Sequence, residues 1–342
     1  KKKIIMKSDI YKSIYEFPDH IKEALNNFDN NSNLNDDYSN IQSIMILGMG
    51  GSAITGLLIS EILKQKIKQP IFINQNYEIP KWVNKNTLVI ASSYSGNTEE
   101  TLIACKKCIE KNCKIIGFTT GGKLLKLLKK MNYNDYVKMP TGLQPRAAIG
   151  YSFTMMLKLL NNITLVNDDI IDDLKNSIKT LTKKTEEYST KNSQAYSIAE
   201  KIYNKNSIIY AEDGIFNIIA YRLKSQLAEN SKILSFNNII PEMNHNEIEA
   251  FTEKTKLQKN LLLIWIDDTI NSKNKERIKI TSKILKAKVE NQISITIRNS
   301  NNQLLNYLNY INLVDWISYH CAILNNVNPA IIPNIDELKK SL

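Results

Sequence analysis

IQSIMILGMGGSA, residues 41–53, is the stretch of sequence that decides the fold. Its first seven residues form a short apolar run, which is typical of a buried strand. Three glycines follow at positions 48, 50 and 51, and residues 53–65 then indicate a helix. A strand, a glycine-rich loop and a helix in this order predict the first unit of an α/β domain.

The same alternation continues along the rest of the chain. In the first half it predicts a helix at residues 99–112 and strands at residues 71–74, 87–92 and 114–119. In the second half it predicts helices at residues 215–228 and 314–324, and strands at residues 207–211, 260–267 and 293–298. Strands that alternate with helices imply a parallel sheet. We therefore expect an α/β fold of two αβα domains, each with a mostly parallel sheet flanked by helices, at residues 1–160 and 196–342, with a polar connecting segment at residues 161–195.

The composition is that of a packed globular protein. Of 342 residues, 43% are hydrophobic and 23% are charged, which excludes a largely disordered or fibrous chain. The net charge of +11 comes from scattered lysines, so we expect neither a nucleic-acid nor a membrane partner. Four cysteines are too few for a disulfide framework, and the basic start lacks the apolar core of a secretory signal. These features favour a cytoplasmic location.

The glycine loop has the spacing of a dinucleotide-binding turn, G-x-G-x-x-A at residues 48–53. Such a site also needs an acidic residue at the end of the second strand, and Asn74-Gln75-Asn76 stands there instead. The sequence therefore favours a smaller anion, bound by Gly50, Gly51 and Ser52 at the start of the helix.

A second loop between a buried strand and a helix, SSYSGNTEET at residues 92–101, is rich in hydroxyl groups. Ser93, Ser95 and Thr98 can donate hydrogen bonds to phosphate oxygens. Thr98 is also a candidate N-cap of the following helix, and the two roles are compatible. The two loops together predict a phosphate site.

Three other motifs have simpler structural explanations. Cys105 and Cys108 fall at i and i+3 of a predicted helix, without a second ligand pair, so we expect them on its buried face rather than on a metal. His320 lies inside an apolar helical stretch, where a core role is expected, and His20 lies in an N-terminal segment. We assign neither histidine to catalysis.

The pair GMGGSA and SSYSGNTEET resembles the phosphate site of sugar isomerase (SIS) domains. Further blocks resemble the bifunctional phosphoglucose/phosphomannose isomerases within that group, in the expected order: PTGLQPRAAIGYS at residues 140–152, AENSK at 228–232, MNHNE at 243–247 and IDELK at 335–339. The similarity covers nearly the whole chain.

This resemblance implies two SIS domains and reversible conversion of glucose 6-phosphate and mannose 6-phosphate to fructose 6-phosphate, without metal or organic cofactor. It implies that Glu229 is the base that moves the proton through a cis-enediolate, and that Arg146 stabilises the enediolate charge. It also implies a homodimer, in which His245 opens the sugar ring in the neighbouring subunit's site together with a C-terminal lysine. Lys339 is the best match to that lysine, with Lys340 as the competitor. The reaction belongs to carbohydrate metabolism, in glycolysis or gluconeogenesis.

Two alternatives use the same phosphate site. A non-catalytic regulator that binds phosphosugars needs none of Glu229, Arg146 and His245, and an SIS isomerase could act on a different sugar phosphate. Asn328-Pro329-Ala330 stands where the family often has an Asp-Pro-Thr-like segment, which leaves the preference between the glucose and mannose substrates open.

Overall fold

The structure, a computed structural model, describes residues 9–253, 255–297 and 300–341, which form two compact units. One unit is Glu16–Lys179, and the other combines residues 9–15 with residues 180–341. The division falls inside helix α8 (Asp169–Tyr188), whereas the sequence suggested a connecting segment at residues 161–195. Two expectations concern residues outside those described: that the N-terminus is not a secretory signal, and that a strand reaches Arg298.

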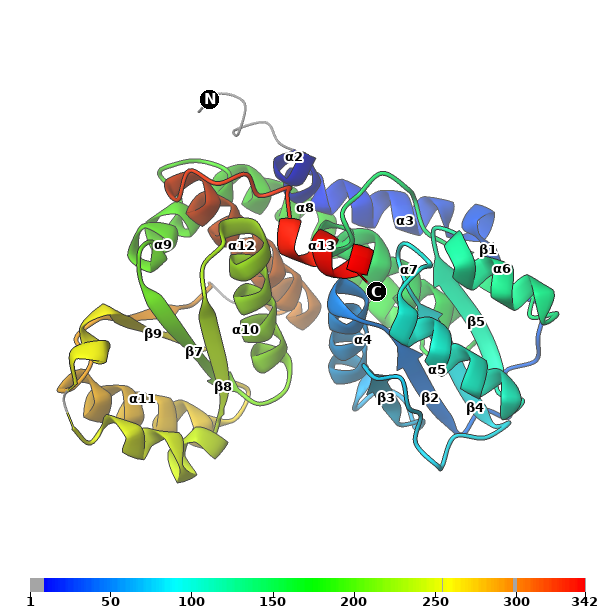
Figure 1. Cartoon of the computed structure of the whole chain (residues 1–342), viewed down its shortest axis with the longest axis horizontal. Helices are drawn as coiled ribbons and strands as arrows, with labels where there is room; N and C mark the ends of the chain where they lie inside the picture. Colours follow the sequence, from blue (N-terminus) through cyan, green and yellow to red (C-terminus); the bar gives the residue numbers. More distant parts are fainter. Residues whose placement is uncertain (1–8, 254, 298–299, 342) are drawn as a thin grey trace. The chain divides into compact units, whose positions relative to one another are not determined.

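The unit Glu16–Lys179 contains a six-stranded sheet in the order β1-β6-β5-β4-β2-β3 (Figure 1). All neighbouring strands are parallel except β1 and β6, which are antiparallel. Its strands are β1 (Ser32–Asn33), β2 (Ser43–Leu47), β3 (Ile71–Asn74), β4 (Thr87–Ser92), β5 (Lys114–Thr119) and β6 (Tyr136–Lys138). Its helices are α3 (Phe17–Asn31), α4 (Gly50–Leu63), α5 (Glu99–Glu110), α6 (Gly122–Lys130), η1 (Pro145–Ala147) and α7 (Ile149–Asn162), with the first part of α8.

Helices cover both faces of this sheet, so all six residues of β4 are buried. Helices α5 and α6 pack on one face, where Cys105 and Cys108 are fully buried against residues such as Ala91. The predicted placement of these two cysteines is confirmed. Burial raises the pKa of the Cys105 thiol to about 12, so this thiol stays protonated and inert at neutral pH.

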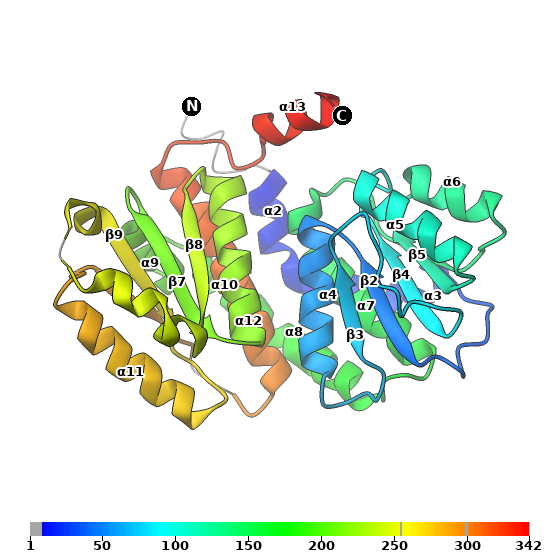
Figure 2. The same ribbon diagram turned by 60° about the horizontal axis from the view of Figure 1, so that its bottom comes forward.

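The other unit contains a four-stranded sheet in the order β10-β9-β7-β8, and all its strands are parallel. The strands are β7 (Asn206–Glu212), β8 (Ser235–Ile240), β9 (Leu261–Ile266) and β10 (Gln292–Ile295). The helices are α2 (Asp9–Tyr15), α9 (Gln194–Ile202), α10 (Ile215–Gln226), η2 (Leu227–Ser231), η3 (Glu242–His245), η4 (Glu247–Phe251), η5 (Lys256–Asn260), α11 (Ser272–Lys286), α12 (Gln303–Leu324) and α13 (Pro333–Ser341), with the end of α8. Helix α11 covers one face of the sheet, and α10 and α12 lie on the other (Figure 2).

Helix α12 is the centre of this unit, because 18 of its 22 residues are buried. Helix α2 packs on it through Tyr11, whose ring lies edge-on to Trp316 at 5.2 Å and to Tyr319 at 5.4 Å. These contacts explain why residues 9–15 group with the later part of the chain. Within the described residues, no helix has both the length and the hydropathy that a membrane span requires.

A buried ion pair joins α10 to α12. The guanidinium of Arg222 donates to both carboxylate oxygens of Asp315, at 2.9 and 2.6 Å, and Gln226 donates to the same carboxylate at 2.9 Å. The side chains of the pair are 1% and 5% exposed. Removal of one partner would leave an uncompensated charge in the core, so the pair fixes how α10 lies on α12.

We expect Asp315→Ala to lower the free energy of unfolding by about 3–5 kcal/mol, because Arg222 loses its buried counter-charge. Glu187→Ala is the matched control in the same unit, because this carboxylate is half exposed and pairs with Lys184 at 2.8 Å on the surface. It should cost less than about 1 kcal/mol. Urea unfolding, followed by the fluorescence of Trp265 and Trp316, measures the free energy of unfolding of both variants. Equal losses of stability would contradict the structural role of the buried ion pair.

Candidate active site

The two predicted phosphate loops follow neighbouring parallel strands. Leu47, at the end of β2, pairs with Ala91 near the end of β4. Strand β3 lies beyond β2 and strand β5 lies beyond β4, so the chain leaves β2 and β4 in opposite directions. Such a reversal of strand order is where open α/β sheets bind their ligands, at the carboxyl ends of the strands.

The first loop leads into α4, whose N-cap residue Met49 offers no side-chain cap. Gly50 has φ of +51° and is exposed, and Gly51 and Ser52 are half-buried. Gly51 has a steric reason to be glycine, because a Cβ there would lie 2.7 Å from the carbonyl oxygen of Pro145. The segment that carries Arg146 therefore passes directly over the start of α4.

The second loop directs two hydroxyl groups toward one another. The Ser93 and Thr98 oxygens are 2.9 Å apart, and Ser93 is 1% exposed while Ser95 is exposed. Thr98 occupies the N-cap position of α5, but its side chain makes no capping hydrogen bond. Its hydroxyl therefore belongs to the loop rather than to the helix end. Gly96 has φ of +68°, and a Cβ there would lie 1.9 Å from the oxygen of Gly121, so the loop requires glycine.

Tyr94 is a residue of this site that the sequence did not reveal. Its hydroxyl donates to the carbonyl of Pro140 at 2.8 Å and accepts from the amide of Leu143 at 3.0 Å. Burial raises the pKa of Tyr94, so the phenol remains a donor. It ties the second loop to the segment before Arg146. The only sequence signal was a large aromatic residue between two serines, which does not identify its partners.

Arg146 lies in η1, at the start of α7, and is 5% exposed. The three segments 48–52, 93–98 and 140–146 are thus brought together in the unit Glu16–Lys179. They supply hydroxyl groups, the start of a helix and a guanidinium that stays charged when buried.

Glu229 lies in a π-helical turn, η2, that continues directly from α10. The sequence predicted a helix that ends at Ala228. The extra turn exists because the residues after Glu229 are anchored to α12: Asn230 donates to the Ser318 hydroxyl at 2.9 Å, and the Ser231 hydroxyl donates to the Ser318 carbonyl at 2.6 Å. Both anchors are buried, whereas Glu229 is half-exposed.

Glu229 lines a pocket of about 410 Å³. One wall comes from Ala228, Glu229, Lys232, Ile233 and Leu234, and the other comes from Ile332, Pro333, Asn334 and Ile335. Lys339 and Lys340 lie further along α13 than this second wall, and both are exposed. The pocket contains a carboxylate in an otherwise mainly apolar lining.

His245 lies beyond one end of strand β8, and Glu229 lies before the other end. Strand β8 begins at Ser235, shortly after the Glu229 turn, and ends at Ile240, shortly before His245. Six residues of strand span about 20 Å. One chain therefore does not bring Glu229 and His245 together. His245 is exposed, whereas His320 is buried, and its Nε2 lies 2.7 Å from the Tyr188 carbonyl oxygen, as expected for a core histidine.

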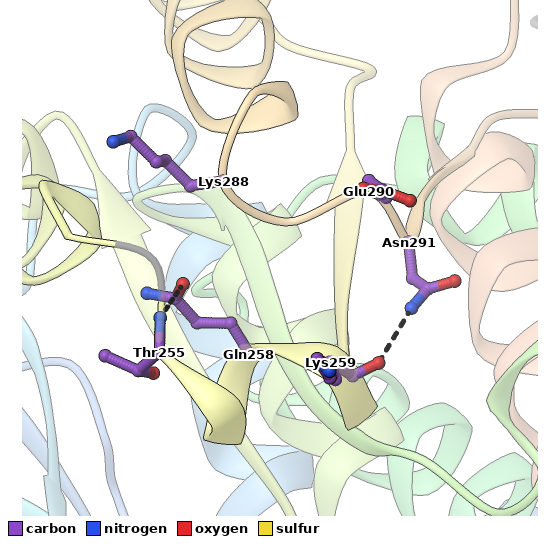
Figure 3. A pocket seen from close by; sticks show the side chains of 6 residues that line it. All are labelled: Thr255, Gln258, Lys259, Lys288, Glu290 and Asn291. Atoms are coloured by element: carbon purple, nitrogen blue, oxygen red, sulfur yellow. Dashed lines mark hydrogen bonds between the residues drawn. The ribbon is translucent and has the colours of Figure 1, made fainter.

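Another recess, of about 280 Å³, lies at the amino ends of β9 and β10 and holds none of the predicted site residues (Figure 3). Two of its bonds are internal: the Thr255 amide donates to Gln258 at 3.0 Å, and the Asn291 side chain donates to the Lys259 carbonyl at 3.3 Å. Its polar groups serve the turns that precede the strands. Within the described residues, no group of three or more His, Cys, Asp or Glu side chains could hold a metal ion.

Gly51→Ala tests the close contact between the first loop and the Arg146 segment. The added methyl group would lie 2.7 Å from a backbone oxygen, so the segment must move. We expect the affinity for fructose 6-phosphate, measured by isothermal titration calorimetry, to fall by about tenfold or more.

Gly56→Ala, in the same helix, is the control for Gly51→Ala. Its methyl group would meet only side-chain atoms of the core, Ile73 Cδ1 at 3.0 Å and Ile46 Cγ2 at 3.1 Å, and not the backbone of the Arg146 segment, so this variant should bind as the wild type does. If Gly51→Ala bound fructose 6-phosphate as tightly as Gly56→Ala does, the segment that carries Arg146 would not be part of the phosphate site.

Comparison with known proteins shows the family of the chain. Residues 191–342 match the family model described as the bacterial phospho-glucose isomerase C-terminal SIS domain. A bifunctional phosphoglucose/phosphomannose isomerase of Caldicellulosiruptor bescii is 37% identical over 97% of this chain and 98% of the relative. One from Thermoplasma volcanium is 34% identical over 87% of this chain and 91% of the relative.

Among solved structures, the C-terminal domain of glucosamine-fructose-6-phosphate aminotransferase from Francisella tularensis has the same fold. Its TM-score is 0.69 at 18% identity, over 94% of this chain and 96% of that one. The relatives at more than 30% identity extend over both units, and the family model covers the second. The chain therefore belongs to the bifunctional phosphoglucose/phosphomannose isomerases, a family of enzymes.

Proposed function

We propose that this protein interconverts fructose 6-phosphate with glucose 6-phosphate and mannose 6-phosphate. The observation that carries the proposal is the position of Glu229. This half-buried residue lines a pocket, while its neighbours Asn230 and Ser231 are hydrogen-bonded to Ser318 of α12. A fixed backbone with an accessible carboxylate is what a general base requires. Membership of the isomerase family gives the reaction class.

The substrate's phosphate binds between the two loops. Ser93, Ser95 and Thr98 donate from their hydroxyl groups, and the first turn of α4 adds backbone amides at Gly50, Gly51 and Ser52. None of these groups takes part in the proton transfer. They hold the substrate in place during the reaction, which lowers its entropy cost.

Glu229 removes the proton from C2 of the open-chain aldose, and the electron pair moves into a cis-enediolate. The same carboxyl group returns the proton to C1 while the hydroxyl proton of O2 passes to O1, which gives the ketose with its carbonyl at C2. Arg146 stabilises the negative charge of the intermediate, and its burial strengthens that interaction because water screens it less. The transfer is balanced within the substrate, so it requires neither a metal nor an organic cofactor.

His245 opens the sugar ring, and we propose that it does so in the site of a second copy. The two residues flank opposite ends of strand β8, which is about 20 Å long, and this supports a homodimer in which Glu229 meets His245 of the partner subunit. Lys339 assists there, with Lys340 as the alternative. We further propose a cytoplasmic location, which the four free cysteines favour, and a role in glycolysis or gluconeogenesis.

The test is a coupled assay of the purified protein on fructose 6-phosphate in metal-free buffer, with glucose 6-phosphate and mannose 6-phosphate measured separately. We expect both products. Glu229→Gln should lower kcat by about 100-fold or more, because the amide cannot accept the proton. If the ligand raised the melting temperature but no product formed, the protein would be a phosphosugar-binding regulator.

A mixing experiment tests the shared site. Glu229→Gln and His245→Asn are each expected to be nearly inactive as homodimers. After reversible dissociation and mixing in equal amounts, half the dimers are hybrid, and one of their two sites has both wild-type residues. We expect about a quarter of wild-type activity to return. No recovery, despite hybrids seen by native mass spectrometry, would mean that the two residues act within one chain.

A further inference from the structure

Lys232 is held by three backbone carbonyl groups. It follows the π turn in the left-handed conformation, with φ of 58° and ψ of 36°. Its ammonium donates to the carbonyl oxygens of Glu229 at 2.6 Å, Ile331 at 2.7 Å and Asn328 at 3.2 Å. An ammonium group has three N–H donors, so these carbonyls can engage all of them.

A lysine at the end of a helix often binds the last carbonyls of that helix. That explanation covers the bond to Glu229 only. Asn328 and Ile331 belong to a segment 96 and 99 residues away in the sequence. One nitrogen atom therefore joins the backbone of the proposed base to the stretch of chain that leads into α13.

This link matters because α13 lies exposed on its unit. The helix begins two residues after Ile331, and none of its side chains is buried. Its first residues nevertheless form one wall of the Glu229 pocket, and Lys339 lies in its last turn. The bonds from Lys232 fix the position of that wall relative to the other wall, which contains Glu229.

We propose that Lys232 is a positioning residue that couples the placement of Glu229 to the placement of α13. The proposal rests on the function proposed above. Lys232 does not act as an acid or a base in it, because its donors bind the backbone. Its charge holds the two walls of the pocket at a fixed separation.

Lys232→Met keeps the unbranched side chain except for its terminal ammonium group and removes the donors. We expect kcat on fructose 6-phosphate to fall by about 10- to 100-fold, because small misplacements of a catalytic group have costs of this size. KM should stay within about twofold, since the phosphate loops lie in the unit Glu16–Lys179. Hydrogen exchange of the α13 amides should speed up, and the melting temperature should change by no more than about 4 °C. Lys283→Met, at an exposed position of α11, is the control and should change none of these quantities.

Rescue separates positioning from general damage. Lys232→Cys followed by alkylation with 2-bromoethylamine rebuilds an ammonium at nearly the same distance from the backbone. The four native cysteines are buried, so the wild type treated in the same way is a valid control. We expect kcat and the slow exchange of α13 to return together.

Unchanged kcat in Lys232→Met, or a loss of kcat without faster exchange in α13, would overturn the proposal. If the wild type has no isomerase activity, the proposed function fails while hydrogen exchange still decides the link. In that case, unchanged α13 exchange in Lys232→Met overturns the link, and faster exchange supports it.

Discussion

The two ends of a β-strand are separated by the whole length of the strand, and this constraint governs the unit of residues 9–15 and 180–341. Strand β8 pairs in parallel with β7 along six residues, with Glu229 before it and His245 after it. No side-chain rotation can span the length of a strand. A site that needs both groups, as the proposed function does, is incomplete in one chain.

Helix α12 gives the same unit its internal order through polar groups rather than through apolar packing alone. Asp315 binds α10, and Ser318 binds the turn after Glu229. Asn309 accepts from the hydroxyl of Tyr188, and Asn312 accepts from Thr185, both near the end of α8. Apolar contacts tolerate small slips of one helix past another, whereas buried hydrogen bonds break. Buried polar groups of this kind fix one register between neighbouring helices. Here that register sets where the Glu229 turn lies along α12.

The sequence predicted the fold well where local pattern and burial agree. The strands predicted at 87–92 and 114–119 are β4 and β5, residue for residue, because both are continuous apolar runs. Strand β8 was missed, since Asn237 and Asn238 interrupt its pattern at the edge of the sheet. Helix α11 was missed too, because its sequence is largely polar and only three of its 15 residues are buried.

The residues of the candidate site also fall into two groups, those that a local motif predicts and those whose partners are distant in the sequence. The hydroxyl-rich loops carry their donor groups in consecutive residues, so a phosphate site at these loops could be predicted without a structure. Both partners of the Tyr94 hydroxyl, and two of the three carbonyl partners of Lys232, lie 46 to 99 residues away along the chain. Such contacts leave no local signal. The π turn also went unseen, because its cause is the pair of anchors on Ser318 and not the residues within it.

The π turn has a further consequence for which mutations the site can tolerate during evolution. A π turn holds one residue more than the α-helical turn it replaces, so it is equivalent to a single-residue insertion. Loss of any one residue between Leu227 and Ser231 would restore α-helical spacing and rotate the following residues by about 100°. Either Glu229 would turn away from its pocket or the anchors on α12 would be lost. The position of the carboxylate thus depends on the number of residues in this turn as much as on their identity.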